Sequence, residues 1–365
     1  MPKTKSTRSV FIEISKGLNT SQTVADQVEL PELNRNAVLI KVKACGLASS
    51  QYDFTALGQL LAKAIKNQRI GVGCDIAGVV QAVGIDVTSL SVGDEVVGIV
   101  PLDYEQSGCS EYVILQEYDV VIKPENVSFV DAAGCIGDSV KAYTALHYLG
   151  RLVSGDTVLV LDGATSFGSI CIQLAHHWGA KILTTSSSEE EKLYLQSLNI
   201  ELAHIIELNH KNASLKSVVM METGNLGVDI VVDQGVGQFP GNCNIYNNDN
   251  KSHHVQFVPS KHDIISCLSV GGRWVTSKAN LQLDPPNSRL LYLRCASVGF
   301  LFEQAWMMSS AQQGRYQHIL MDIMEKVATK TIRPHIQQNI SFSGVLEMVK
   351  SLEQSRLGKT VMVTT

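Results

Sequence analysis

Short runs of β-branched and other apolar residues, separated by Gly, Pro and Asp, dominate the chain up to about residue 126. Three of these runs, at residues 37–43, 76–80 and 95–100, have the length and composition of strands. The apolar residues in these runs do not recur at the spacing of three or four residues that is typical of a helix. This part of the chain is therefore predicted to form a compact β-barrel.

A different pattern begins near Asp131, where apolar residues recur at spacings of three and four up to Leu149 and predict a helix. After Gly155-Asp156, apolar runs and helical patterns alternate. The predicted strands are residues 157–161, 181–185, 228–233, 273–276 and 296–300, and the predicted helices are 168–177, 189–198 and 317–327. Strands that alternate with helices indicate a parallel sheet. The tail, residues 359–363, is predicted to be a strand again.

A length of 365 residues predicts two domains, because single domains usually hold about 100 to 200 residues. We place a β-rich domain at residues 1–135 and 328–365, and a parallel-sheet domain at residues 136–327. The second domain carries a polar, Asn-rich insertion at residues 237–259, which is predicted to be an exposed loop. Its length and polarity make it the candidate surface for a protein partner.

Charge and cysteine usage narrow the class of protein. The chain has 30 basic and 35 acidic residues, and therefore a net charge of −5 with no long basic run, so direct binding to nucleic acid is not expected. No apolar run approaches the ~18 residues of a membrane span. The eight cysteines are scattered singly, which favours reduced, buried thiols. A cytosolic or peripherally membrane-associated protein is expected.

The segment from Asp162 to Gly168 joins a predicted strand to a predicted helix, which is the order that a dinucleotide-binding loop requires. Against the pattern G-x-G-x-x-G, Gly163 and Gly168 are present, and the middle position is Thr165. In such a loop the glycines allow a tight turn, close approach to the pyrophosphate and packing of helix on strand. The candidate phosphate contacts are Gly163, Ala164, Thr165, Ser166, Phe167 and Gly168.

Two residues of this loop oppose a dinucleotide. Thr165 puts a β-branched side chain where a pyrophosphate normally meets bare backbone, and Asp162 adds a negative charge. The hydroxyls of Thr165 and Ser166 and the helix N-terminus could still donate to phosphate. The alternative is a loop that closes the fold and binds nothing, and the residues alone leave both interpretations open.

The end of the second strand of this domain reads Ser186-Ser187-Ser188. Enzymes that use NAD place an acid there to hold the ribose hydroxyls, so the absence of an acid favours NADP. Lys192 could pair with a 2′-phosphate, although the three glutamates at residues 189–191 would oppose one. The alternative for these charges is a first helical turn that suits the helix dipole.

These residues, together with residues 228–233, 270–275 and 358–361, resemble the quinone oxidoreductase branch of the medium-chain dehydrogenase/reductase family, the zeta-crystallin relatives. The resemblance covers nearly the whole chain. It implies an α/β fold, with a GroES-like β-barrel domain, completed by the C-terminal strands, and a Rossmann domain with a doubly wound parallel sheet. It also implies that NADPH and a quinone or enone meet in the cleft for hydride transfer.

The resemblance implies a site without zinc. Zinc-dependent members carry a ligand Cys where this chain has Ala48 and a Gly-His-Glu string where it has Gly73-Cys74-Asp75, and their third ligand falls near Gly137. The active quinone reductases carry polar groups where this chain has Ala48 and Gln51. Tyr52 and Asp53 are the nearby candidates for a proton donor. Leu208 stands where some relatives place a tyrosine beside the adenine.

Two further groups of residues have simpler interpretations. His176 and His177 are adjacent on a helix and point about 100° apart, which favours capping or packing over metal binding. His253 and His254, with His262 beyond, give a weak metal signal in a segment better explained as a solvated loop.

A second function stays open beside the reductase. The altered loop and pocket favour a catalytically inactive protein that keeps the medium-chain fold as a binding module. For such a protein the resemblance implies a subunit of a cytosolic Rab-effector complex at early endosomes, linked to mRNA transport. A homodimer is compatible with either function.

Overall fold

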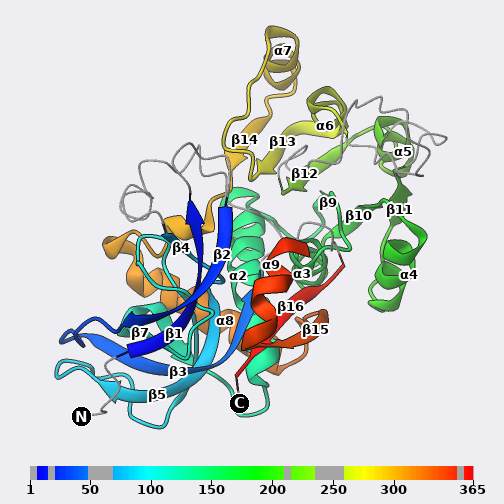
Figure 1. The fold of residues 1–365 in the computed structure, drawn as a ribbon. Coiled ribbons are helices and arrows are strands. Elements are labelled where there is room, and N and C mark those ends of the chain that lie inside the picture. Colours follow the sequence, from blue (N-terminus) through cyan, green and yellow to red (C-terminus); the bar gives the residue numbers. More distant parts are fainter. Residues whose placement is uncertain are drawn as a thin grey trace, which may run out of the picture. The chain divides into compact units, whose positions relative to one another are not determined.

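The computed structural model describes residues 6–14, 21–47, 69–208, 215–234, 259–351 and 357–364. Its contacts divide the chain into two units, one formed by residues 1–140 and 303–365 and the other by residues 141–302. The first unit is β-rich and the second alternates strands with helices, as the sequence predicted (Figure 1).

The first unit contains a seven-stranded sheet and a three-stranded sheet. Its strands are β1 (Ser6–Ile14), β2 (Ser21–Glu29), β3 (Ala37–Leu47), β4 (Arg69–Gly71), β5 (Asp75–Val83), β6 (Glu95–Ile99), β7 (Tyr112–Gln116), β8 (Val120–Ile122), β15 (Ile336–Ser341) and β16 (Lys359–Val363). The order β15-β16-β3-β5-β6-β8, with β7 also paired to β3, builds the larger sheet, and β2-β1-β4 builds the smaller one. The predicted strand at residues 359–363 is confirmed, and its antiparallel pairing with β3 brings the C-terminal segment into the N-terminal sheet.

Helices and short 3-10 turns complete this unit: η1 (Glu117–Asp119), η3 (Glu303–Ala305), η4 (Ser310–Gln312), α8 (Gln313–Ala328), η5 (Phe342–Gly344) and α9 (Val345–Ser351). Helix α2 (Phe129–Tyr143) begins here and ends in the second unit. The division differs from the expected domain boundary, because residues 303–327 fall in the first unit rather than in the parallel-sheet domain. The reason is α8, which packs against η1 and β8, with Gln317 Nε2 donating to the Glu117 carbonyl at 3.1 Å.

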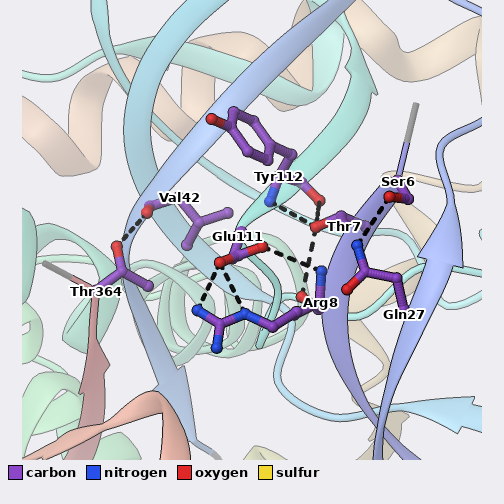
Figure 2. A network of polar contacts seen from close by, with 8 residues as sticks. All are labelled: Ser6, Thr7, Arg8, Gln27, Val42, Glu111, Tyr112 and Thr364. Carbon is purple, nitrogen blue, oxygen red and sulfur yellow. Dashed lines mark hydrogen bonds and ion pairs between the residues drawn. The ribbon is translucent and has the colours of Figure 1, made fainter. Parts of the chain in front are cut away.

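Polar contacts attach β1 to the larger sheet at the segment that leads into β7 (Figure 2). The Arg8 guanidinium donates to Glu111 Oε1 at 2.6 and 2.9 Å, and the Tyr112 N–H donates to Thr7 Oγ1 at 3.0 Å. At the other end of the chain, the Thr364 hydroxyl donates to the Val42 carbonyl. Both the first described strand and the last one are thus tied to the middle of this unit.

A buried ion cluster links three elements of the first unit. Lys359 Nζ, at the start of β16, lies 3.2 Å from Asp75 Oδ2 on β5 and 2.8 Å from Asp138 Oδ2 on α2. Burial opposes the charge on Lys359, but the two carboxylates more than offset it and raise its pKa above the ordinary value. Burial raises the pKa of Asp75 to about 6, against the opposing influence of Lys359.

The second unit is a six-stranded parallel sheet with the order β11-β10-β9-β12-β13-β14. Its strands are β9 (Thr157–Val160), β10 (Lys181–Ser186), β11 (His204–Glu207), β12 (Val228–Asp233), β13 (Leu268–Thr276) and β14 (Ser297–Phe300). Its helices are η2 (Thr144–Leu149, a π-helix), α3 (Ser166–His177), α4 (Glu189–Ser197), α5 (Leu215–Glu222), α6 (Lys261–Cys267) and α7 (Pro285–Leu293). Numbered along the chain, this strand order is 3-2-1-4-5-6, the order of a doubly wound Rossmann sheet.

Continuous apolar runs form the central strands because a parallel sheet is covered on both faces. Val158, Leu159 and Val160 of β9 are fully buried, and Trp274 of β13 is the largest side chain in the core between this sheet and its helices. Strand order reverses between β9 and β12, and ligands of such sheets bind at the carboxyl ends of the strands beside that reversal. The segment 162–168 leaves β9 at this point.

We predict that Lys359→Met lowers the free energy of unfolding by about 3 to 5 kcal/mol, because the substitution leaves the buried carboxylate of Asp75 and the partly buried carboxylate of Asp138 without their cation. Chemical unfolding followed by circular dichroism would measure the loss. Arg8→Met, which breaks the exposed ion pair with Glu111, is the control and should cost far less. Equal stability of the two variants would contradict a role for the buried cluster.

We predict that Asp119→Asn flattens the dependence of stability on pH. Burial raises the pKa of Asp119 to about 6, against the N–H of Gln116 and the hydroxyl of Tyr104 that donate to it at 3.2 and 3.1 Å. Because this pKa exceeds the ordinary value of 3.8, the stabilisation is complete below about pH 4 and is lost as pH rises through 6. Urea unfolding would measure the free energy of unfolding at pH 5 and at pH 7.5, and the difference between the two should be smaller in the variant by about 1.4 kcal/mol. An unchanged difference would mean that Asp119 titrates at the same pH in the folded and unfolded chain.

Candidate functional site

The loop after β9 is held to the neighbouring strand β10 at its first two residues. Asp162 has a positive φ of 55°, and its N–H donates to Thr185 Oγ1 at 2.8 Å. The N–H of Gly163 donates to the Thr185 carbonyl at 3.2 Å. These bonds fix where the chain turns from strand β9 towards helix α3.

Both glycines of the loop are required by close backbone approach. A Cβ on Gly163 would lie 1.9 Å from Thr184 Oγ1, and a Cβ on Gly168 would lie 2.4 Å from the Asp162 carbonyl oxygen. A larger residue at position 163 would push the loop away from β10, and one at position 168 would push α3 away from the end of β9. Gly163 and Gly168 therefore carry the turn and the packing of helix on strand that the sequence assigned to them.

Thr165 is the N-cap of α3, and its hydroxyl makes three hydrogen bonds. It accepts from the Gly168 N–H at 3.0 Å and from Gln234 Nε2 at 2.6 Å, and it donates to the Asp162 carbonyl at 2.8 Å. A hydroxyl has one proton to donate and two lone pairs. While these bonds hold, the Thr165 hydroxyl has no capacity left for a phosphate.

The other loop residues differ in how far a ligand could reach them. The side chains of Ala164 and Phe167 are buried, and the Lys141 ammonium lies 5.0 Å from the Phe167 ring centroid. Ser166 is partly exposed, and its carbonyl accepts from the Ser169 hydroxyl at 3.0 Å. The backbone N–H groups of Ser166 and Phe167, at the N-terminus of α3, are the candidate donors to a phosphate.

The carboxyl end of β10 carries a buried hydroxyl that makes no hydrogen bond. Ser186 is 1% exposed, and its Oγ has no partner among the described residues. The next N–H, that of Ser187, donates to Glu191 Oε2 at 2.6 Å, and the Ser188 hydroxyl caps α4 by accepting from the Glu191 N–H. The cap confirms that the acidic residues 189–191 form the first helical turn.

Lys192 is paired within the protein. Its Nζ lies 2.7 Å from Glu207 Oε1, at the end of β11, and 3.8 Å from Glu189 Oε2. The hydrogen bond with Glu207, and the charges of both glutamates, raise the pKa of Lys192 above its ordinary value. A 2′-phosphate at Lys192 would have to compete with Glu207 for the ammonium.

Several expected site residues lie outside the described residues. These are Tyr52 and Asp53, the candidate proton donors, Ala48 and Gln51 beside them, His253 and His254, and residues 237–258 of the insertion. Their predicted roles stay predictions.

The ion cluster of Asp75, Asp138 and Lys359 lies beside Gly137, one of the positions at which the resemblance places a zinc ligand. Asp75 belongs to the cluster with Lys359, and its Oδ1 lies 2.2 Å from where a Cβ on Gly137 would be. Cys109 and Cys45 are buried, with their Sγ atoms 3.8 Å apart. Within the part of the chain that the structure describes, no group of three or more His, Cys, Asp or Glu side chains could hold a metal ion. His176 and His177 are both exposed at the end of α3.

Among the residues with a described structure, none forms a helix that is both long and apolar enough to cross a bilayer.

Three contacts of the candidate site were not predicted from the sequence. Gln234, Glu191 and Glu207 each bind a residue of the predicted cofactor site, at Thr165, Ser187 and Lys192 respectively. Gln234 and Glu207 stand directly at or after the ends of strands β12 and β11, where ligand-binding side chains of parallel sheets gather. That position was the available signal, whereas the pairings depend on tertiary structure.

Comparisons with known proteins fit this geometry. Residues 34–145 match the alcohol dehydrogenase GroES-like domain. Solved structures of similar fold include a Pseudomonas syringae quinone oxidoreductase (20% identity, TM-score 0.77, covering 98% of this chain and 100% of that one) and the CurK enoyl reductase (22% identity, TM-score 0.74, covering 98% and 99%). Both are too distant in sequence to show more than the fold.

Two curated relatives are closer in sequence. Tomato (Solanum lycopersicum) 2-methylene-furan-3-one reductase is 37% identical over 183 residues, which cover 48% of this chain and 46% of that protein. Mouse (Mus musculus) quinone oxidoreductase-like protein 1 is 42% identical over 315 residues, which cover 86% of this chain and 87% of that protein. With the GroES-like match and the Rossmann sheet, this similarity shows that the chain belongs to the quinone oxidoreductase-like branch of the medium-chain dehydrogenase/reductase family.

Proposed function

We propose that this protein is a zinc-independent reductase that transfers hydride from a nicotinamide dinucleotide to a quinone or another electron-poor alkene. The observation that carries the proposal is the position of the Gly163–Gly168 loop, between β9 and α3 at the reversal of strand order. The relatives named quinone oxidoreductase-like protein 1 and 2-methylene-furan-3-one reductase support the substrate class.

The described residues fit a dinucleotide at two points. The N-terminus of α3 offers the N–H groups of Ser166 and Phe167, and the helix dipole favours a pyrophosphate there. The unpartnered Ser186 hydroxyl, at the end of β10, suits a ribose hydroxyl. The dinucleotide supplies the hydride, and the protein contributes mainly placement. Tyr52 and Asp53 are the proposed donors of the proton that completes the reduction.

The preference for NADPH stays a prediction from Ser186-Ser187-Ser188 and Lys192. The pairing of Lys192 with Glu207 opposes it. A homodimer stays a prediction.

A second candidate is a catalytically inactive binding module, a subunit of a cytosolic Rab-effector complex at early endosomes. One observation favours this candidate. The Thr165 hydroxyl makes its full set of hydrogen bonds within the protein, with Asp162, Gly168 and Gln234, at the position where a pyrophosphate would bind. In that case residues 237–259 are the proposed partner surface.

Titration of the purified protein with NADPH and with NADH separates the two candidates. For the reductase we expect saturable binding of at least one dinucleotide at micromolar concentration, measured by nicotinamide fluorescence or calorimetry. The absence of binding at millimolar concentration of both would overturn the reductase and support the binding module.

We predict that Thr165→Gly tightens dinucleotide binding about tenfold, because it frees the backbone for the pyrophosphate and releases Gln234. Glycine is itself a tolerated N-cap, so the helix should lose only a few tenths of a kcal/mol. Thr165→Ser keeps the hydroxyl and its three bonds and should leave the affinity unchanged. Calorimetric dissociation constants would decide, and equal tightening in both variants would show that the methyl group alone is the obstacle.

A further inference from the structure

Two glutamates lie beside the carboxyl end of β10, although the strand itself ends in serines. Glu191 reaches back from α4 and accepts the Ser187 N–H at 2.6 Å, and it is 8% exposed. Glu207 is the last residue of β11 and pairs in register with Ser186. The end of β10 carries no acidic residue of its own, but helix α4 and strand β11 each place a glutamate beside it.

The unpartnered Ser186 hydroxyl points to a ligand at this place. Side chains two apart on a strand lie on the same face of the sheet, so Ser186 shares a face with Thr184. Thr184 Oγ1 lies against Gly163, with 1.9 Å between it and the position of a Cβ there. Ser186 is therefore on the face that carries the glycine loop. A buried hydroxyl without a partner costs free energy that a hydrogen-bonding ligand would recover.

The charges at this strand end oppose an anion. The Lys192 ammonium lies 2.7 Å from Glu207 and 3.8 Å from Glu189, and Glu191 adds a third carboxylate at the N–H of Ser187. A 2′-phosphate would bring a charge of about −1.5 to −2 into this set. A free 2′-hydroxyl would instead donate to a carboxylate, as it does to the acid of NAD enzymes.

We propose that Glu207, together with Glu191, determines the cofactor specificity of the site and selects a dinucleotide with a free ribose 2′-hydroxyl over one with a 2′-phosphate. Glu207 acts in two ways: its carboxylate repels the phosphate, and it keeps Lys192 from binding one. The inference rests on the proposed function, since it specifies which dinucleotide the reductase would use. It reverses the preference for NADP that the three serines predicted.

The test measures dissociation constants of the full chain for NADH and NADPH by calorimetry, and for the fragments 5′-AMP and 2′,5′-ADP by ligand-observed NMR. The wild type should bind NADH and 5′-AMP at least about tenfold tighter than their 2′-phosphorylated counterparts, because two nearby negative charges oppose the phosphate. Glu207→Gln should reduce this ratio of dissociation constants about tenfold, because the ligands with a 2′-phosphate then bind more tightly.

Two variants control for indirect effects. Glu190→Gln removes an exposed charge from the same helical turn and should change the ratio far less than Glu207→Gln, because solvent screens the charge of Glu190. Glu207→Gln combined with Lys192→Met should restore the wild-type ratio in part, because the released ammonium is then absent. A merely structural role for Glu207 would change the affinity for both ligands of a pair equally and would overturn the proposal.

The outcomes separate this inference from the proposed function. Tighter binding of NADPH than of NADH by the wild type would overturn the inference and leave the reductase standing. A preference for 5′-AMP over 2′,5′-ADP without binding of either dinucleotide would support the inference and overturn the reductase. Failure of all four nucleotides to bind would overturn both.

Discussion

The contact between Gly163 and Thr184 sets the geometry on which the second unit depends. Strand β9 can turn into α3 only because no side chain separates the loop backbone from β10, and the Gly168 backbone closes on Asp162 in the same way. Once the helix N-terminus is fixed there, the ends of β9, β10, β11 and β12 are brought to one edge of the sheet. Thr165, Ser186, Glu207 and Gln234 then become neighbours of one candidate site.

This edge combines features that attract a dinucleotide with features that oppose one. The N-terminus of α3 and the unpartnered Ser186 hydroxyl suit an adenosine diphosphate, whereas the saturated Thr165 hydroxyl and the surrounding glutamates restrict what can bind. Fold alone does not decide between catalysis and binding, because both depend on a few side chains. The balance at this edge is therefore decided by Thr165, Glu191 and Glu207 rather than by the Rossmann sheet.

Sequence patterns identified the buried strands well and the polar ones poorly. The strand at residues 228–233 was predicted with both ends correct, because a run of buried β-branched residues is unmistakable. Strand β15 was missed, since its Gln-Gln-Asn segment is exposed and shows no apolar pattern. The loop residues 163–168 were proposed from their spacing. The contacts of Glu191 with Ser187 and of Glu207 with Lys192 could not be proposed, because they form only after the helix and strands have packed. The expected proton donors, Tyr52 and Asp53, lie outside the described residues.

The pairing of β16 with β3 has a consequence for the order in which the protein forms during synthesis. The second unit is continuous in sequence, so it can fold as soon as its last strand has left the ribosome. The first unit has to wait for residue 359, because until then its largest sheet lacks a strand and the carboxylates of Asp75 and Asp138 lack their cation. The half of the protein that is made first is thus the half that is finished last.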